Sequence, residues 1–230
     1  MSGAQGGQTR GPLAGRTVML TGAGGALATV VADALREAGA TLVLVARGGH
    51  GLTAREGETI VEADLATHEG AASLAAYRAD ALVHTAGGFA MRKVHEATPE
   101  DLRAMFSANV DTLFHATRAV LPTMRAAGRG VIVGIGAGQA ARGAGAGAAL
   151  YTAAKSAVHA FLKSLDAEGR EAGVRATVLV PMGAIDTPAN RESGMKPEAM
   201  IDPRDLADAV VFVLTRSPRG HVDELRVNPR

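Results

Sequence analysis

The sequence predicts an α/β protein in which a doubly wound parallel sheet lies between two layers of helices, as in Rossmann-like three-layer α/β/α folds. Short, almost purely apolar segments alternate with longer helical segments along the chain. The apolar segments are too continuous for strands with one face in water, so helices must cover both faces of the sheet. The 230 residues, 47% of them hydrophobic, suffice for one such domain with a full core.

The expected strands are the short apolar segments, several of them rich in β-branched residues. Because connections between parallel strands are right-handed, a doubly wound order is the expected arrangement. The strands are predicted over residues 18–20, 41–45, 59–61, 81–83, 131–135, 174–180 and 222–227.

Four long helices are expected, over residues 26–38, 99–127, 150–172 and 205–214. Gly39 is a natural C-cap for the first helix, and Pro122 predicts a kink or break in the second. The Ala- and Gly-rich segment 134–149 connects a strand to a helix and is expected to be an active-site loop. Residues 1–15 are expected to form a flexible tail, which leaves 16–230 as a single domain.

Composition excludes several classes of function. The net charge is +1 and the arginines are scattered, so neither nucleic acid nor an anionic membrane is an expected partner. Without cysteine there is no disulfide or thiolate nucleophile, and the histidines lack metal-ligand spacing. The sequence has no signal peptide and no apolar run long enough to span a bilayer, so a cytoplasmic protein is expected.

A glycine-rich turn follows the first predicted strand, at residues 21–28. Its glycines permit a tight turn and let backbone N–H groups approach a pyrophosphate at the helix N-terminus. The strict G-x-G-x-x-G pattern fails because Leu27 occupies the third glycine position, and an ordinary βα connection explains the turn equally well. The candidate cofactor-binding residues of this turn are Gly22, Gly24, Gly25, Ala26 and Leu27.

The ends of the second and third strands indicate which dinucleotide is bound. An acidic residue after the second strand would bind the adenosine ribose of NAD, but Ala46 and Arg47 stand there. The planar guanidinium of Arg47 suits a phosphate, which favours NADP(H) over NAD(H), although an arginine at a strand end can also be merely solvated. Asp64, followed by Leu65, could accept a hydrogen bond from adenine, cap a helix, or do both.

Tyr151 and Lys155 are the candidate reaction centre. Residues at i and i+4 share a helix face, and a nearby ammonium is expected to lower the pKa of the Tyr151 phenol. Such a tyrosine can exchange a proton with a substrate heteroatom. A chance surface pair is the alternative, but the pair falls at the start of the helix after the fifth strand. His84, at the end of the fourth strand, is interpreted as structural.

In their order along the chain, these motifs resemble the short-chain dehydrogenase/reductase family from Arg16 to the C-terminus. The family's T-G-x-x-x-G-x-G turn is similar to residues 21–28, its N-N-A-G segment to 84–87, its helix asparagine to Asn109, its Y-x-x-x-K to 151–155, and its Pro-Gly…Thr segment to 181–187.

The resemblance implies roles for these residues. Tyr151 would be the general acid, Lys155 would bind the nicotinamide ribose and tune Tyr151, and Asn109 would support a proton-relay water. The backbone at Ala86 and Gly87 would pass close to the cofactor. Pro181 and Thr187 would face the nicotinamide. The family usually forms homodimers or homotetramers through two long helices, here 99–127 and 150–172.

The chain departs from the family pattern at three places. Ala26 and Ala28 replace two glycines, and His84-Thr85 replaces the usual Asn pair. The third departure is the family's serine, about thirteen residues before the tyrosine, which stabilises developing negative charge on a carbonyl substrate; no Ser or Thr lies between Thr123 and Tyr151. Losing such a donor costs roughly a hundredfold or more in carbonyl reduction.

The dihydropteridine reductase branch of the family lacks the same serine, and its substrate is a quinonoid pterin. The chain is similar to that branch at residues 25–27, 86–89, 136–138, 157–159 and 186–191. That branch prefers NADH, however, and has the acidic residue that Ala46-Arg47 replaces. Residues 189–200 would form the mobile flap that selects the substrate.

Three hypotheses follow. The first is an NADP(H)-dependent reductase of a quinonoid, imine-like or otherwise activated small molecule. The second is an ordinary carbonyl or alcohol oxidoreductase in which Tyr151 or water replaces the serine. The third is a non-catalytic dinucleotide-binding protein that acts as a sensor or scaffold.

Overall fold

The computed structural model describes residues 11–48, 51–217 and 219–230. Seven parallel strands form a single sheet: β1 (Thr17–Thr21), β2 (Thr41–Ala46), β3 (Thr59–Glu62), β4 (Ala81–His84), β5 (Gly130–Ile135), β6 (Val174–Pro181) and β7 (Glu224–Val227). Their order, β3-β2-β1-β4-β5-β6-β7, reverses direction between β1 and β4. The predicted doubly wound α/β fold is confirmed.

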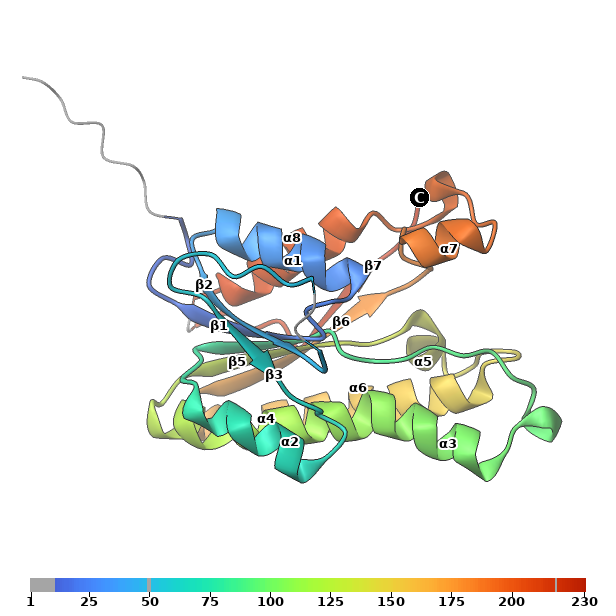
Figure 1. Cartoon of the computed structure of the whole chain (residues 1–230), viewed down its shortest axis with the longest axis horizontal. Coiled ribbons are helices and arrows are strands. Elements are labelled where there is room, and N and C mark those ends of the chain that lie inside the picture. The colour runs from blue at the N-terminus through green and yellow to red at the C-terminus, as the bar shows by residue number, and fades with distance from the viewer. Residues whose placement is uncertain (1–10, 49–50, 218) are drawn as a thin grey trace, which may run out of the picture.

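Helices cover both faces of the sheet (Figure 1). On one face lie α1 (Ala26–Glu37) and α8 (Pro203–Leu214), and on the other lie α2 (His68–Ala72), α3 (Pro99–Phe106), α4 (Thr112–Ala126) and α6 (Ala149–Gly169). Two short helices, α5 (Gly138–Arg142) and α7 (Pro188–Glu192), follow β5 and β6. Single 3-10 turns complete the described elements at Ser73–Ala76, Val94–Glu96, Arg170–Ala172 and Pro197–Ala199.

The central strand β1 shows why the apolar segments are continuous. Val18 and Leu20 belong to the core beneath α1 and α8, whereas Met19 between them belongs to the core beneath α4 and α6. All three side chains are fully buried. Burial of such a side chain contributes about 2 kcal/mol, so a polar residue would be costly at any of these three positions.

The long helix predicted over 99–127 is interrupted, but not at Pro122. A π-helical turn at Ser107–Asp111 separates α3 from α4, and α4 continues past Pro122 to Ala126. Pro122 is exposed, so water can solvate the carbonyl group of Arg118, which loses its helical partner. Of the kink or break predicted at Pro122, the break is therefore absent, and the irregular turn at Ser107–Asp111 brings Asn109 into the interior.

The predicted N-terminal tail ends earlier than expected. Leu13 is fully buried, and its N–H donates to the carbonyl oxygen of Ala38 at 2.8 Å. A Cβ added at Gly11 would lie 2.3 Å from the same oxygen. Residues 11–15 therefore pack against the domain, which corrects the boundary placed at residue 16. Residues 1–10 of the predicted tail lie outside the described residues.

Two further differences concern predicted loops. The segment 134–149 contains the end of β5 and the short helix α5, and the predicted flap 189–200 contains most of α7. Within the described ranges, no helix combines the length and the hydropathy needed to cross a membrane.

Candidate active site

A cleft of about 520 Å³ opens at the carboxyl edge of the sheet, where the strand order reverses between β1 and β4. This is the place where doubly wound sheets bind ligands. Ala26 and Leu27, by contrast, begin α1 and do not line the cleft. Of the predicted cofactor-binding residues, those that line it are Gly22, Gly24, Gly25, Arg47, Asp64, Leu65, Ala86 and Gly87.

The glycine turn after β1 packs closely against the segment after β4. Gly22 has a φ of +70°, and a Cβ added there would lie 2.6 Å from the backbone nitrogen of Ala86. At Gly24, by contrast, an added Cβ would meet nothing within 4 Å. Gly22 is therefore required by the fold itself, while Gly24 leaves the backbone open toward the cleft.

Arg47 extends from the end of β2 at the rim of the cleft. It is exposed and makes no hydrogen bond or ion pair with any other residue in the described part of the chain. Because no residue of 11–48, 51–217 or 219–230 pairs with its guanidinium, that group is available to an anionic group of a ligand.

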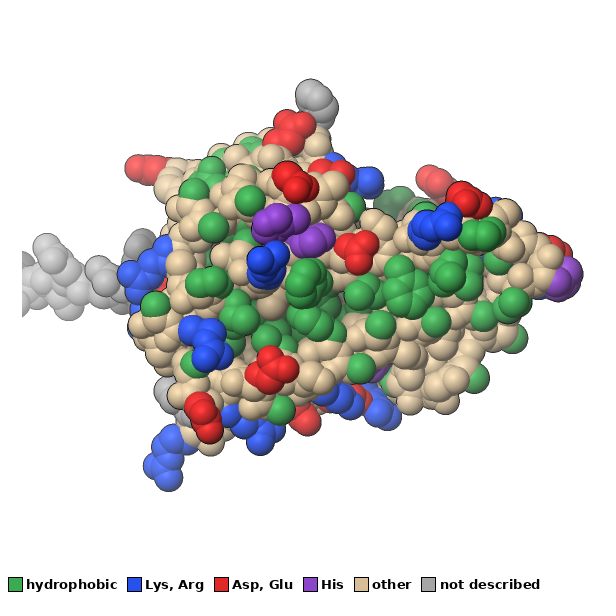
Figure 2. Space-filling model, turned by 90° about the horizontal axis from the view of Figure 1, so that it is seen from below, with side chains coloured by type: hydrophobic (Ala, Val, Ile, Leu, Met, Phe, Trp, Pro, Cys, Tyr) green, Lys and Arg blue, Asp and Glu red, His purple; other side chains and the backbone are tan. Residues whose placement is uncertain are grey.

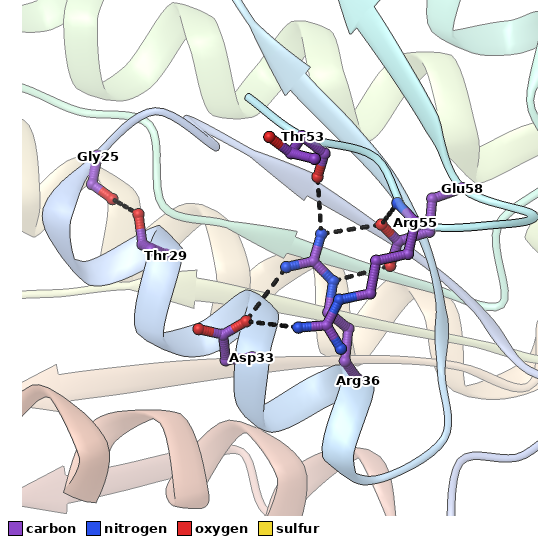
Figure 3. Close-up of polar contacts among 7 residues, drawn as sticks. All are labelled: Gly25, Thr29, Asp33, Arg36, Thr53, Arg55 and Glu58. Atoms are coloured by element: carbon purple, nitrogen blue, oxygen red, sulfur yellow. Dashed lines mark hydrogen bonds and ion pairs between the residues drawn. The ribbon is translucent and has the colours of Figure 1, made fainter. Parts of the chain in front are cut away.

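The connection after Arg47 is fixed to α1 by a different arginine, Arg36 (Figure 3). Arg36 donates two hydrogen bonds to Glu58, at 2.9 and 2.8 Å, one to Asp33 at 3.2 Å and one to the carbonyl oxygen of Thr53 at 3.2 Å. Nearby, Arg55 forms an ion pair of 3.4 Å with Asp33. These contacts hold the connection without using Arg47.

Asp64 lines the cleft beyond β3 but does not cap the following helix. Its Oδ1 accepts from the N–H of Ala66 at 3.0 Å, and Thr67 is the residue that caps α2, accepting from Gly70 at 3.0 Å. The helix-cap alternative for Asp64 was therefore wrong, although Asp64 stabilises the turn before the helix.

Asn109 and Lys155 lie against Gly87, which lines the cleft, and Tyr151 neighbours Lys155 on the same helix. A Cβ added at Gly87 would lie 2.9 Å from Oδ1 of Asn109 and 3.5 Å from Nζ of Lys155. Lys155 is buried on α6 and donates to the carbonyl oxygen of Ile135 at 2.9 Å. Tyr151 lies one turn earlier on the same helix, with the Lys155 ammonium 6.0 Å from its ring centroid.

Asn109 is held rigidly within the π-helical turn. It is buried, and its Nδ2 donates to the carbonyl oxygens of Gly88 and Met105, each at 3.0 Å. Its Oδ1 accepts from the N–H of Gly88 at 3.3 Å. The side chain thus fixes the segment after β4 beside Lys155.

Burial decides the pKa values of the central pair. It raises the pKa of Tyr151 to about 12 and lowers the pKa of Lys155 to about 8. The expected lowering of the Tyr151 pKa by Lys155 was therefore wrong, because loss of hydration on burial raises that pKa. At neutral pH Tyr151 is protonated, which suits a proton donor.

One aromatic side chain, Phe89, packs against Tyr151. The ring of Phe89 packs edge-on against that of Tyr151, with centroids 4.9 Å apart, and is 60% exposed. Met91 and Val94 follow on the same connection and are also exposed. The backbone of Arg92 is tied to Gly147 by a hydrogen bond of 2.7 Å, which holds this connection beside the start of α6.

Pro181 and Thr187 lie away from the lining of the cleft. Pro181 ends β6, and the hydroxyl of Thr187 caps α7 by accepting from Asn190 at 3.4 Å. His84 is buried between Thr21 (2.8 Å) and Thr112 (3.3 Å), and its pKa is lowered to about 3 by burial and by Lys155. His84 is therefore neutral and hydrogen-bonded through both ring nitrogens, which agrees with the expectation that it has a structural role.

Several lining residues were missed by the sequence analysis. Val45, Ala63, Ala66 and Thr85 flank residues that were chosen, so their proximity to strand ends could have identified them. Residues on α3, the π-helical turn and α4 have no motif, and only packing places them in the cleft: Ala104, Ser107, Ala108 and Thr112. No group of three or more potential metal ligands occurs within 11–48, 51–217 and 219–230.

The chain belongs to the short-chain dehydrogenase family, whose model matches residues 16–198. It is 29% identical over 229 residues to an uncharacterized oxidoreductase of Staphylococcus haemolyticus, covering 94% of this chain and 98% of that protein. The structure of a metagenomic short-chain oxidoreductase in complex with NADP matches with a TM-score of 0.78 at 26% identity, covering 95% of this chain and 99% of that one.

A 3-ketoacyl-(acyl-carrier-protein) reductase from Brucella melitensis, complexed with NADH, has a TM-score of 0.82. At 24% identity, with 94% of this chain and 98% of that chain covered, it shows likeness of fold alone. The protein is therefore an oxidoreductase of the short-chain dehydrogenase type, with a fold that binds nicotinamide dinucleotides. Because one neighbour holds NADP and the other NADH, the choice of cofactor depends on this chain's own residues.

Proposed function

We propose that the protein is an NADP(H)-dependent oxidoreductase that reduces a small activated acceptor, quinonoid, imine-like or carbonyl, with Tyr151 as proton donor. The observation that supports this most directly is the position of Gly87. It lines the cleft and also lies against Asn109 and Lys155, so the dinucleotide cleft reaches the amine that neighbours Tyr151.

The residues of the cleft fit a phosphorylated dinucleotide. The glycine turn offers open backbone at Gly24, Asp64 and Leu65 border the cleft beyond β3, and the unpartnered guanidinium of Arg47 suits a 2′-phosphate. Ala46 stands where an acidic residue would repel that phosphate. These features favour NADP(H), and a bound nicotinamide ring supplies the hydride.

The chain's own residues supply the proton and the positioning. Tyr151 is protonated at neutral pH and lies one helical turn from Lys155, whose protonated amine is held by Ile135. Lys155 can stabilise the phenolate that forms as Tyr151 gives up its proton. Asn109 holds the backbone beside this pair and keeps its geometry fixed during the transfer.

The missing serine bears on the substrate. The position of that serine falls at Ala137 or Gly138, and at Gly138 an added Cβ would lie 3.0 Å from the Cα of Met182, so the packing there leaves little room for a side chain. An acceptor that already carries its own activation, such as a conjugated C=N or quinonoid system, has less need of that hydroxyl. The exposed ring of Phe89 beside Tyr151 suits a flat, weakly polar acceptor.

The test is an NADPH-oxidation screen with a quinonoid dihydropterin beside a panel of simple ketones, repeated with NADH. We expect turnover with NADPH and the activated acceptor to exceed turnover with the ketones by a hundredfold or more. Equal turnover of ketones would favour the ordinary carbonyl reductase instead. No NADPH consumption with any acceptor would favour the non-catalytic alternative.

We also propose that the chain forms a homodimer or homotetramer through the layer of α4 and α6. Figure 2 shows hydrophobic side chains gathered on the face that this layer presents. Phe114 on α4 is exposed, and its ring lies 6.3 Å from that of Phe161 on α6. Phe114→Glu should convert the assembly to monomers in sedimentation experiments, and a monomeric wild-type chain would contradict this assignment.

A further inference from the structure

The turn after β5 is held by two side chains of α6, Lys155 and His159. Lys155 donates to the carbonyl oxygen of Ile135 at 2.9 Å. One helical turn further, Nε2 of His159 accepts a hydrogen bond of 3.2 Å from the N–H of Ala137. Between these two contacts, the N–H of Gly136 donates to Leu179 at 2.8 Å. The backbone of three successive residues, 135–137, is therefore held by hydrogen bonds to α6 and β6, next to the position of the missing serine.

The contact with His159 leaves no space around the turn. A Cβ added at Gly136 would lie 2.2 Å from Nε2 of His159 and 2.8 Å from Cγ1 of Val178. His159 itself is 8% exposed, so its ring cannot move aside into solvent without unpacking α6 from the sheet. Only glycine at position 136 therefore leaves room for the imidazole of His159.

The direction of this hydrogen bond fixes the protonation state of His159. An N–H donates to Nε2, so Nε2 carries no proton, and the neutral ring has its proton on Nδ1. Burial lowers the pKa of His159, and the neighbouring cations Lys155, Lys163 and Arg226 act in the same direction, while Glu224 opposes them. Glu224 is itself paired with Lys163 at 2.7 Å and Arg226 at 2.6 Å.

We propose that neutral His159 is a positioning residue for the reaction: it holds residues 136–138 in place beside Tyr151 and Lys155, and its protonation releases them. If Nε2 were protonated, two hydrogen-bond donors, Nε2–H and the N–H of Ala137, would face each other. Because they repel, the turn would have to move. Ile135, the partner of Lys155, lies only two residues away and would move with it. This inference rests on the proposed function for its catalytic consequence, but the contact itself can be tested without turnover.

The first measurement is NMR of the whole protein with labelled histidine and backbone nitrogen. We expect the Nδ1–H tautomer of His159 at pH 7.5. We also expect the amide signal of Ala137 to shift as His159 titrates below pH 6.5. In His159→Gln, whose amide oxygen can accept the same hydrogen bond without titrating, the Ala137 signal should no longer respond to this pH change. An Ala137 amide that is indifferent to the state of His159 would overturn the proposal, whether or not the enzyme is active.

The second measurement is NADPH oxidation with the quinonoid dihydropterin between pH 5 and 8. The kcat of wild type should fall as the pH is lowered from 7.5 toward 5. The kcat of His159→Gln should stay within about threefold of the wild-type value at pH 7.5 and should not show this fall at acid pH. His159→Leu, which fills similar space without an acceptor, should lower kcat or raise KM at least tenfold while leaving the Kd for NADPH within about twofold. Unchanged kinetics in His159→Leu over the whole pH range would refute the positioning role.

A steric variant tests the same contact if His159→Leu fails to fold. Gly136→Ala should displace the turn, because the added methyl collides with Nε2, and should reproduce the kinetic loss. Combining it with His159→Ala removes the collision with the imidazole but not the 2.8 Å approach to Cγ1 of Val178, so the double variant should recover part of the thermal stability lost in Gly136→Ala. A Gly136→Ala protein with wild-type kinetics and an unshifted Ala137 amide would overturn the inference.

Discussion

Acid should weaken this fold through one buried histidine, His84. Its ring bridges Thr21 on β1 and Thr112 on α4, and its pKa is lowered to about 3 by burial and by Lys155. An unfolded histidine has a pKa of about 6.5. Because the folded pKa is the lower one, the unfolded chain takes up the proton first. Stability is therefore fully present above pH 6.5 and is lost progressively as the pH falls toward 3.

The size of this effect follows from the two pKa values. Between pH 7 and pH 5 the unfolded chain gains about 2 kcal/mol from protonating this residue, while the folded chain, with a pKa of about 3, gains almost nothing. The free energy of unfolding should therefore fall by about 2 kcal/mol on account of His84. For a chain of this length that corresponds to a decrease of roughly 4–8 °C in the midpoint of thermal unfolding.

The assay compares wild type with His84→Gln by urea and thermal unfolding at pH 7 and pH 5. The glutamine keeps polar atoms near the two threonines but does not titrate. His159 and His221 also have lowered pKa values, but both are present in both proteins, so their contributions cancel in the difference. The variant should be less stable than wild type at pH 7 yet lose about 2 kcal/mol less on acidification. The same loss in both proteins would refute the reasoning.

Three further predictions concern the site. Tyr151→Phe should lower kcat by about a hundredfold or more, with the Kd for NADPH within about twofold in fluorescence titrations; full turnover would eliminate Tyr151 as proton donor. Arg47→Ala should raise the Kd for NADPH about tenfold or more, because charge-assisted hydrogen bonds to the 2′-phosphate are lost, and should hardly change the Kd for NADH. Equal effects on the two Kd values would contradict the assignment of Arg47 to the phosphate. Ala137→Ser should raise ketone reduction if the protein is an ordinary carbonyl reductase and leave it unchanged if its acceptor is activated. Gly138→Ser serves as a comparison in which the added side chain has little room, because its Cβ would lie 3.0 Å from the Cα of Met182.

The sequence by itself determined the fold class and the location of the site. Alternating apolar and helical segments are local patterns, and they fixed the strands closely, as at Thr41–Ala46 against the predicted 41–45. Residues that follow parallel strands must gather at one edge of the sheet, so Gly24, Arg47, Asp64 and Gly87 could be assigned to one cleft before any distance was known.

Only the tertiary structure decided how these groups behave chemically. Burial raises the pKa of Tyr151, and the i, i+4 spacing of Tyr151 and Lys155 does not reveal how deeply the phenol is buried. The contact between His159 and Ala137 joins residues 22 positions apart, and the crowding of Gly138 comes from the end of another strand. Sequence patterns report the local preferences of the chain, whereas hydration, close approach and hydrogen-bond direction depend on distances that exist only once distant segments have packed.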